Sequence, residues 1–360
     1  MEDTQMAFKS KQKHLTFSDF EKSFKKKNRS LETVKNLEKA IAWYRIESVL
    51  LKDYPVGQKK EGNKAYNPLL LFKCLLLQKW FQIKSDPELE SQINDRQSFQ
   101  TFLGLSANQS SPDHSTFSKF RKRLTKGKFD IIVGDILNQF SDQGLTINEG
   151  IAIDARIVKS ASKPISKKKL KELKTNRSKP GGEFDKNGNV RKFSRDLESD
   201  WTIKNDKAYY GLKEHAAVDT NTGLILTTVL SRASVHDTNY FPYCTLYSRH
   251  TKHPLAIVYA DKGYAGEPNR TFLSLNKFKD GIMRKDSTTA KLTGYEKDRN
   301  KKISKVRYIV EQYFGLSHLH DDGQQARFTT IAKNNMDIWF RQVAFNIKRG
   351  FKLTQELSTA

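Results

Sequence analysis

The sequence predicts an α/β protein in which a mixed sheet with flanking helices follows an all-helical N-terminal domain. Three observations support this fold class. Helix signals fill residues 31–130, β-branched apolar runs begin near residue 150, and two long helical patterns close the chain. A chain of 360 residues is long enough for two such domains, each with its own core.

The predicted organisation has three parts. Residues 1–30 are basic and polar and are expected to be loosely ordered, residues 31–145 form the helical domain, and residues 146–350 form the domain with the sheet. A lysine-rich segment at about 161–207 interrupts the second domain. Its composition indicates a long basic loop, which is either a solvated excursion or a loop that contacts nucleic acid.

Helix signals follow one another through the N-terminal domain. Residues 30–51 carry apolar positions at helical spacing, and residues 67–81 are apolar nearly all round, which predicts a core helix. A polar capping residue followed by proline is typical of a helix start. This signature occurs at Asn67-Pro68, Asp86-Pro87 and Ser111-Pro112.

Strand signals dominate the start of the second domain. Residues 149–161 form a β-branched run, and residues 209–234 indicate a hairpin around a turn at residues 219–223. Residues 254–263 are apolar on both faces, as a central parallel strand requires. A further strand at 280–285, a long helix at roughly 298–317 and an amphipathic basic helix at 334–352 complete the prediction.

The charge balance indicates an acidic polymer as partner. The formal net charge is +24, with 29% charged and 37% hydrophobic residues. Such a charge repels itself, and phosphate neutralisation makes nucleic acid the first candidate to offset it. An anionic membrane surface is the alternative. The most apolar window, at residues 67–81, is too short to span a bilayer, and the N-terminus lacks a signal-peptide core, which predicts a cytoplasmic protein without membrane contact.

One helix of the N-terminal domain is a candidate for DNA contact. In residues 112–124, Phe117, Phe120 and Leu124 recur at helical spacing and form an apolar face. A capped helix with basic residues on its exposed faces can bind DNA, and the alternative is a solvated helix in an ordinary bundle. The net charge favours DNA contact through Lys119, Arg121, Lys122 and Arg123.

Three carboxylates in the second domain occupy positions that indicate one site. Asp154 lies in the first strand, Asp261 ends the central parallel strand, and Glu311 lies on the long helix. Sites in open α/β sheets gather at the carboxyl ends of strands, so this order can bring the three groups to one rim.

Each carboxylate also has an ordinary interpretation. Asp154 can be a turn or cap residue, Asp261 can cap a turn before Gly263, and Glu311 can be a surface charge paired with Arg307. Arginine before glutamate is the weaker order for a helix pair, so helix support alone explains that pair poorly.

The residue types predict metal-dependent chemistry on phosphodiesters. Carboxylate oxygens are ligands that Mg²⁺ prefers, and a few of them suffice when substrate phosphate completes the site. Two such ions about 4 Å apart can activate a water or a 3′-hydroxyl and stabilise the leaving oxygen. The sequence has no phosphate-binding Gly-Lys-Ser/Thr loop, so no nucleotide cofactor is expected.

A series of motifs completes this interpretation. The helical part contains NPLLLFKCLLLQKWF, SDPELE and SPDHSTFSKFRKRL, and the later part contains AIDARIVKSA, YYGLKEHAAVDTNTGLI, ASVHDTN, VYADKGYAG and KVRYIVEQYFG. In this order, over about residues 30–350, they resemble the DDE transposases of bacterial insertion sequences. The resemblance is to the insertion-sequence-five branch, which is related to the insertion-sequence-four superfamily.

The resemblance implies a fold, a site and an activity. The fold would be ribonuclease-H-like, with Asp154, Asp261 and Glu311 holding two Mg²⁺ ions, for which Mn²⁺ can substitute. The protein would bind double-stranded DNA at element ends and at the target as a homodimer. It would catalyse cleavage and strand transfer of the cut-and-paste type. Two alternatives stay open: a nuclease without strand transfer, and a non-catalytic DNA-binding protein derived from a transposase.

The last motif departs from the family in part. Related transposases often carry tyrosine and lysine where this chain has Ser304 and His318, so the stacking role of that tyrosine is not implied. His318 stays a candidate phosphate ligand when it is protonated. Arg307 matches the family, and it would orient Glu311 or contact phosphate.

Smaller features have two interpretations each. Lys213 and His215 alternate on a hairpin strand and share a face, which predicts either a phosphate contact or an exposed sheet edge. Asp237 is interpreted as a helix cap rather than a metal ligand with His236. The two cysteines, Cys74 and Cys244, have no partner at zinc-ligand spacing and are expected to be buried.

Overall fold

Two units account for the residues whose structure is described. The computed structural model describes residues 29–57, 64–106, 108–147, 149–178, 196–249, 256–287, 291–321 and 323–359. One unit combines residues up to Leu145 with those from Val343 onward, and the other runs from Thr146 to Gln342 with a break near residue 250. The basic N-terminal segment, up to residue 28, lies outside the described residues.

The first unit is helical. Its helices are α2 (Arg29–Lys39), α3 (Trp43–Leu51), α4 (Pro68–Trp80), α5 (Asp86–Asp95), α6 (Gln97–Leu103), α7 (His114–Arg123), α8 (Lys126–Asp142) and the C-terminal part of α13 (Ile331–Thr359). The continuous helix predicted at residues 30–51 is two helices. Ala42 between them is extended, and its N–H donates to Gln139 Oε1 at 2.6 Å instead of to a helical carbonyl.

The core of this unit forms around α4, as its apolar pattern predicts. Phe72 and Leu76 are fully buried, and Phe117 and Phe120 of α7 are fully buried as well. The C-terminal part of α13 belongs to the same core. Trp80 Nε1 donates to the Ala344 carbonyl at 2.9 Å, and Gly350 lies so close to the Phe140 ring that a Cβ would collide with it.

The helix caps correct two sequence predictions and confirm one. Asn67 caps α4 as predicted, since its Oδ1 accepts from Leu69 N at 2.7 Å. Ser85, not Asp86, caps α5, because the Ser85 hydroxyl is the group that accepts from an N–H of the first turn. Asp113, not Ser111, caps α7. In both cases the capping side chain stands one or two residues from the predicted one.

The second unit is built on a mixed sheet. Its strands are β1 (Gly150–Lys159), β2 (Asp200–Lys204), β3 (Lys207–Asp219), β4 (Ile225–Arg232), β5 (Ile257–Ala260) and β6 (Lys279–Ile282). Its helical elements are α9 (Lys167–Ser178), η1 (Asp237–Tyr240), α10 (Phe241–Leu246), η2 (Lys262–Tyr264), α11 (Glu267–Leu275), α12 (Gly294–Asp321) and the first part of α13.

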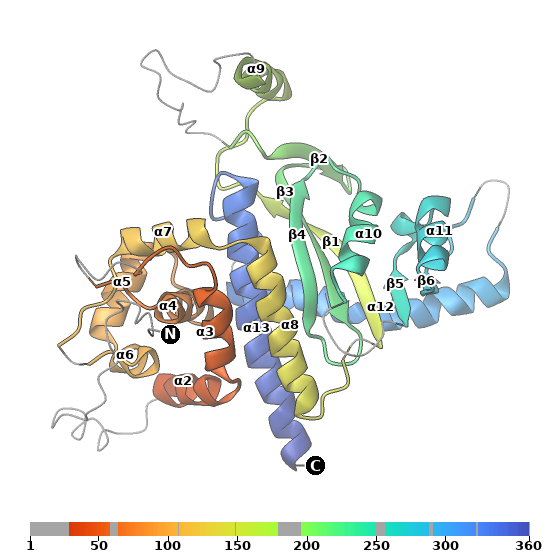
Figure 1. Cartoon of the computed structure of the whole chain (residues 1–360). Coiled ribbons are helices and arrows are strands. Elements are labelled where there is room, and N and C mark those ends of the chain that lie inside the picture. Colours follow the sequence, from red (N-terminus) through yellow and green to blue (C-terminus); the bar gives the residue numbers. More distant parts are fainter. Residues whose placement is uncertain are drawn as a thin grey trace. The chain divides into compact units, whose positions relative to one another are not determined.

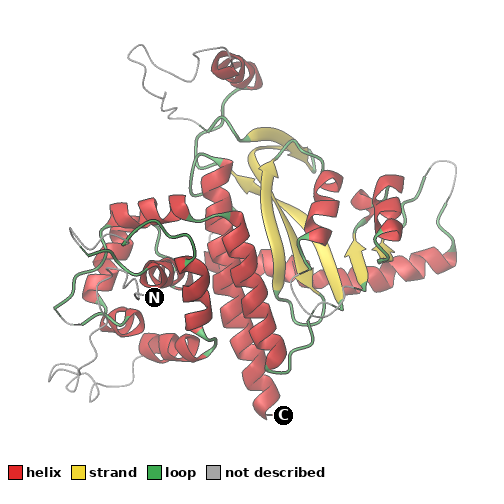
Figure 2. Ribbon diagram, in the orientation of Figure 1, coloured by secondary structure: helices red, strands yellow, loops and turns green. Residues whose placement is uncertain are grey.

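The strand order confirms the predicted fold class. The order is β2-β3-β1-β5-β6, and β4 pairs with the half of β3 that follows the part paired with β2. These strands are drawn in yellow in Figure 2. β3 and β4 form the predicted antiparallel hairpin, while β5 and β6 run parallel to β1 and to each other. The strands β2, β3 and β4 pair antiparallel on one side of β1, and β5 and β6 run parallel to β1 on its other side. This arrangement is a ribonuclease-H-like sheet.

Helices cover both faces of this sheet (Figure 1). Arg156 of β1 pairs in register with Glu214 of β3, and both side chains face α12. The neighbouring position on β3, His215, faces the other way and stacks on Tyr240 of η1 at a ring distance of 4.3 Å. Strand alternation therefore assigns α12 to one face and η1–α10 to the other.

The basic segment at 161–207 contains regular structure where the sequence predicts a loop. Helix α9 and strand β2 lie within it, and its residues 179–195 are outside the described ranges. Leu170, Leu197 and Tyr210 form a small buried cluster, against which Trp201 packs. These few apolar side chains order the segment despite its charge.

Candidate active site

Asp154 lies midway along β1, level with Asp261, which directly follows the last residue of the neighbouring strand β5. The parallel ladder between β1 and β5 pairs Ala152 with Tyr259. Each aspartate lies two residues further along its own strand direction, and adjacent strands are about 4.8 Å apart. The negative charge of Asp261 accordingly helps to raise the pKa of Asp154.

Asp154 is held between its own strand and α12. Its Oδ1 accepts from Ala155 N at 2.8 Å, and its Oδ2 accepts from Arg307 Nη2 at 2.9 Å. Burial raises the pKa of Asp154 to about 6, while the charge of Arg307 opposes that rise. The carboxylate is thus oriented on both oxygens and titrates well above an ordinary aspartate.

Asp261 caps the turn that follows β5, as its ordinary interpretation predicts. Its Oδ1 accepts from Gly263 N at 2.7 Å and starts η2. A Cβ at position 263 would come within 2.9 Å of the same oxygen, so a larger residue here would push that oxygen aside. The turn uses one oxygen only, and within the described residues no contact engages Oδ2. Capping therefore leaves a carboxylate oxygen available beside Asp154.

Glu311 lies on α12 one turn beyond Arg307. Its side chain is exposed, and it makes no hydrogen bond or ion pair with any residue that the structure describes. Arg307 is 6% exposed and contacts Asp154, not Glu311. The ligand atoms of Asp154, Asp261 and Glu311 do not all lie within 4.8 Å of one another.

The donor set fits a hydrated, hard cation. Carboxylate oxygens are the ligands that Mg²⁺ selects. The Tyr264 hydroxyl is buried without a hydrogen-bond partner among the described residues, and burial together with the charges of Asp154, Asp237 and Asp261 raises the pKa of Tyr264 well above its usual range. A buried hydroxyl without a partner, in the field of these carboxylates, suits a site that takes up an ion with its waters.

A buried polar network fixes α12 on the sheet behind these residues. Arg156 donates twice to Glu214 Oε2, at 2.8 and 2.6 Å, and also to the Phe314 carbonyl and the Ser317 hydroxyl of α12. Tyr313 donates to Glu214 Oε1 at 2.6 Å. Burial alone would raise the pKa of Glu214, but the charge of Arg156 and the Tyr313 hydrogen bond lower it, so Glu214 stays ionised.

Sequence reasoning missed this network. Arg156 follows Asp154 by two residues, so strand alternation places both on the same face. That spacing was the available signal. The partner Glu214 could not be inferred, because its contact depends on the register between β1 and β3.

Lys213 lies on the face opposite Asp154. Its ammonium is 2.7 Å from Asp237 Oδ1 and donates to the Val235 carbonyl at 2.8 Å. The interpretation as an exposed sheet edge is wrong, because β3 pairs on both sides and His215 is fully buried. His236, not Asp237, caps η1, since Asp237 is engaged by Lys213.

The candidate DNA-binding residues of α7 differ in their surroundings. Lys119, Lys122 and Arg123 are exposed. Arg121 is largely buried in an ion pair with Asp86, which also accepts from Gln78. His318 of the second unit is exposed near the end of α12. DNA contact by these residues, and by Lys213, stays a prediction.

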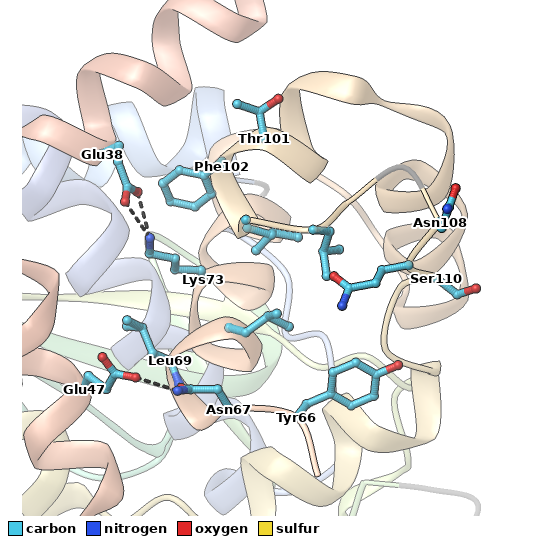
Figure 3. Close-up of a pocket in the computed structure, with 15 residues that line it drawn as sticks. Glu38, Glu47, Tyr66, Asn67, Leu69, Lys73, Thr101, Phe102, Asn108 and Ser110 are labelled. Carbon is cyan, nitrogen blue, oxygen red and sulfur yellow. Dashed lines mark hydrogen bonds and ion pairs between the residues drawn. The ribbon is translucent and has the colours of Figure 1, made fainter. Parts of the chain in front are cut away.

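Other polar features of the first unit have internal partners. A cavity of about 870 Å³ is bordered by α2, α3, α4 and α6 (Figure 3). Lys73 points to Glu38 with two contacts of 2.8 Å, and Asn67 donates to Glu47. Glu90, Asp113 and His114 bring ligand atoms within 4.8 Å of one another, but Glu90 already accepts from the backbone and ring of His114.

Fold and carboxylates together define the class. A ribonuclease-H-like sheet with one aspartate in β1, a second directly after β5 and a glutamate on the later helix α12 has the layout of a DDE enzyme. A family model described as a transposase DDE domain matches residues 147–347, more than half of the chain, and one described as a transposase domain (DUF772) matches residues 18–123. The chain belongs to the DDE transposase family.

The chain is similar to a curated relative and to two solved structures. The transposase for insertion sequence element IS1106 of Neisseria meningitidis serogroup B is 29% identical over 244 residues, which cover 64% of this chain and 76% of that protein. The piggyBac transposase in a synaptic complex with hairpin DNA covers 91% of this chain and 76% of its own at 9% identity and a TM-score of 0.42. The Mos1 strand transfer complex gives 10% identity, a TM-score of 0.25, and coverage of 92% and 97%. Within the described residues, no helix combines the length and apolar character needed to cross a membrane.

Proposed function

We propose that the protein cleaves DNA at the ends of its own insertion element and joins those ends to target DNA in a Mg²⁺-dependent reaction. The observation that carries this proposal is the pair Asp154 and Asp261 on adjacent parallel strands, tied to the helix of Glu311 through Arg307. The Neisseria relative is named as the transposase of an insertion sequence element, which supports an element of this class as substrate.

Asp154, Asp261 and Glu311 would hold two Mg²⁺ ions, and Mn²⁺ can substitute because it accepts the same oxygen ligands. When bound, such ions lower the pKa of water and neutralise charge on the oxygens of the phosphodiester. The protein's own part is to fix the carboxylates. Arg307 holds one oxygen of Asp154, and the Asp261 turn leaves its second oxygen facing out of the cap.

The chemistry proceeds in two exchanges at phosphorus. In the first, water adds to the phosphodiester at the element end, the P–O3′ bond breaks, and a 3′-hydroxyl is released after protonation. In the second, that 3′-hydroxyl attacks a phosphodiester of the target, forming one P–O bond as another breaks. Arg307 Nε is buried with no hydrogen-bond partner among the described residues, so it can donate to a phosphate oxygen brought to Asp154.

The substrate would be double-stranded DNA at two places, the element ends and the target. The net charge of +24 supports a polyanionic partner, since each phosphate contact releases condensed counterions. Exposed Lys119, Lys122 and Arg123 on α7 offer a first DNA contact, and His318 lies on the helix of Glu311. A homodimer would bring the two ends together for paired cleavage.

A cleavage and joining assay tests the proposal. A labelled duplex with the element's own end is incubated with the protein in Mg²⁺ or in EDTA, with an unlabelled plasmid as target. The wild type should nick and join only with Mg²⁺, and Asp261→Asn should do neither. Asp206→Asn is the matched control, because Asp206 is exposed in a turn with a positive φ that asparagine tolerates.

The products decide between the proposal and its alternatives. Metal-dependent cutting without joined product would show that the protein is a nuclease without strand transfer. Binding without chemistry in the wild type, under conditions where a known transposase works, would leave a DNA-binding protein. Equal activity in Asp261→Asn and Asp206→Asn would remove Asp261 from the site.

A further inference from the structure

Helix α12 presents an exposed basic face that leads along the helix to Glu311. Lys297, Lys301 and Lys305 are exposed, and Tyr308 on the same face is 58% exposed. The other face of the helix is buried against the sheet through Ile303, Arg307, Val310 and Tyr313. We call the exposed set, Lys297, Lys301, Lys305 and Tyr308, the lysine face.

Helical geometry aligns this face with Glu311. At about 100° per residue, Lys297, Tyr308 and Lys301 lie about 40°, 60° and 80° around the helix from Glu311. Lys305 lies about 120° away. Lys302 is also exposed, but it lies about 180° from Glu311. The lysine face therefore approaches the carboxylate from one side over about 21 Å of helix, and Lys302 marks the side opposite Glu311.

The lysine ammonium groups of this face form no ion pair within the part of the chain that the structure describes. Lys297, Lys301 and Lys305 form no salt bridge or side-chain hydrogen bond with any residue that the structure describes. Elsewhere, lysines pair with an acid one turn away on their own helix, as Lys126 does with Asp130 and Lys352 with Glu356.

An acid of this kind is available on α12 and is not used. Asp298 precedes Lys301 by three residues, yet the two side chains are unpaired among the described contacts. Glu296 instead accepts from the backbone and hydroxyl of Thr293 at the start of the helix. Like charges one helical turn apart repel each other, so an ordinary solvated helix gains nothing from this arrangement.

We propose that the lysine face binds the phosphates of the DNA strand next to the bond that is cut, and that Tyr308 stacks on a base of that strand. A polyanion relieves the repulsion between the lysines, and an exposed aromatic ring among cations is the usual combination for nucleic acid strands. This inference rests on the proposed function for the position of the cut, but the binding itself needs neither metal nor chemistry.

The first test measures how binding depends on salt. The probe is a labelled duplex with the element end, titrated in EDTA at several KCl concentrations so that no cleavage occurs. Removing one lysine–phosphate interaction should reduce the slope of log K against log salt by about 0.9. K297Q/K301Q/K305Q should therefore reduce the slope by roughly 2 to 3. Glutamine and lysine have similar helix propensities, so the helix is kept.

Adjacent single variants give the matched control. K301Q and K302Q remove the same charge from neighbouring exposed positions, of which only Lys301 lies on the side of α12 that leads to Glu311. K301Q should lower the slope by about 1, and K302Q should leave it at the wild-type value. Equal slopes in all variants would overturn the proposal and leave a solvated face. Equal reductions in K301Q and K302Q would overturn it as well, because the effect would then be a general one of charge and not of this side of the helix. Circular dichroism checks that α12 is intact in each variant.

Stacking by Tyr308 has a different signature. Tyr308→Ala should weaken binding of a single-stranded element-end probe roughly tenfold while leaving the salt slope unchanged. An unchanged affinity would remove Tyr308 from the proposal.

The result is separable from the catalytic proposal. A wild-type protein that never cleaves, but whose slope falls in the triple variant, would reject the proposed function and keep the lysine face as a DNA surface. If the triple variant cleaves normally and its salt slope equals that of the wild type, the proposed function is kept and the lysine face is rejected as a DNA surface.

Discussion

Arg307 Nη2 lies 2.9 Å from Asp154 Oδ2, and this ion pair joins the helix of Glu311 to the first strand of the sheet. The sequence hypothesis has Arg307 orienting Glu311 or contacting phosphate. The structure shows Arg307 paired with Asp154 and not with Glu311, while phosphate contact through its Nε stays part of the proposal. This explains why arginine precedes glutamate on α12 in an order that stabilises helices poorly, since its partner is on another element.

Asp154 should make the metal-free protein less stable as the pH rises. Its pKa is raised from 3.8 to about 6 by burial. Between those values the folded state holds a proton that the unfolded state has released, so the free energy of unfolding falls with rising pH and levels off above about 6. Asp154→Asn removes this contribution, which is about 3 kcal/mol over the full titration.

Urea unfolding in EDTA at pH 4.5 and 7.5 checks this prediction. The wild type should lose stability relative to Asp154→Asn across that interval. Parallel curves for the two proteins would show that Asp154 titrates as an ordinary exposed carboxylate.

Substitutions in the buried network of Arg156, Glu214 and Tyr313 should lower the free energy of unfolding most when they leave a buried charge without its partner. Tyr313→Phe removes one hydrogen bond to an ionised group and should cost about 1.5 to 3 kcal/mol. Glu214→Ala leaves the Arg156 guanidinium buried without its partner and should cost about 3 to 5 kcal/mol. Tyr308→Phe, on the exposed side of the same helix, should change the free energy of unfolding by less than about 0.5 kcal/mol.

Chemical denaturation of the three variants decides the point. If Tyr313→Phe is as stable as Tyr308→Phe, the Tyr313–Glu214 hydrogen bond adds nothing to the fold.

Two glycines in and beside α12 should respond in opposite directions to alanine. A Cβ at Gly323 would lie 2.6 Å from Arg156 Nη2 and would also collide with the Ser317 hydroxyl, so Gly323→Ala should destabilise the protein by about 1 to 3 kcal/mol. Gly315 is exposed within α12, and an added Cβ would have no atom within 4 Å. Gly315→Ala should therefore stabilise the protein by up to about 1 kcal/mol. Melting temperatures of both variants test the contrast, and two shifts of the same sign would contradict it.

Basic residues on α7 should divide into structural and DNA-contacting groups. Arg121→Gln breaks the largely buried pair with Asp86, so it should lower the melting temperature more than it affects the salt dependence of DNA binding. Lys122→Gln should keep the melting temperature and reduce the salt slope by about 1. A reduced slope in Arg121→Gln with unchanged stability would place Arg121 at the DNA instead.

Regular elements with strong patterns were predictable from the sequence. The apolar run ending at Asp261 gives a central parallel strand, and the turn at 219–223 gives the β3–β4 hairpin. The basic segment was not predictable as α9 and β2, because its many lysines outweigh the few apolar residues that order it. Leu170 and Leu197 are buried only through a cluster formed with Tyr210, a contact that composition does not reveal.

The candidate site divides in the same way. Asp154 lies inside the first strand and Asp261 directly follows a parallel strand, and this pattern predicts that the two lie together once those strands are neighbours. The partners Arg307 and Glu214 depend on how α12 and β3 pack on β1, which is non-local. The shared face of Lys213 and His215 was predictable, but not that this face is opposite the carboxylates.

Synthesis of the chain runs from one unit into the other and back. Helix α13 supplies the Ala344 carbonyl to Trp80 and places Gly350 against Phe140, so the helical unit lacks part of its core until the residues from Val343 onward are made. On the ribosome, the sheet-bearing unit can therefore close before the helical unit does. A chain that stopped before Val343 would carry its carboxylates beside a helical unit without these contacts, and so without a finished scaffold for the DNA contact proposed for α7.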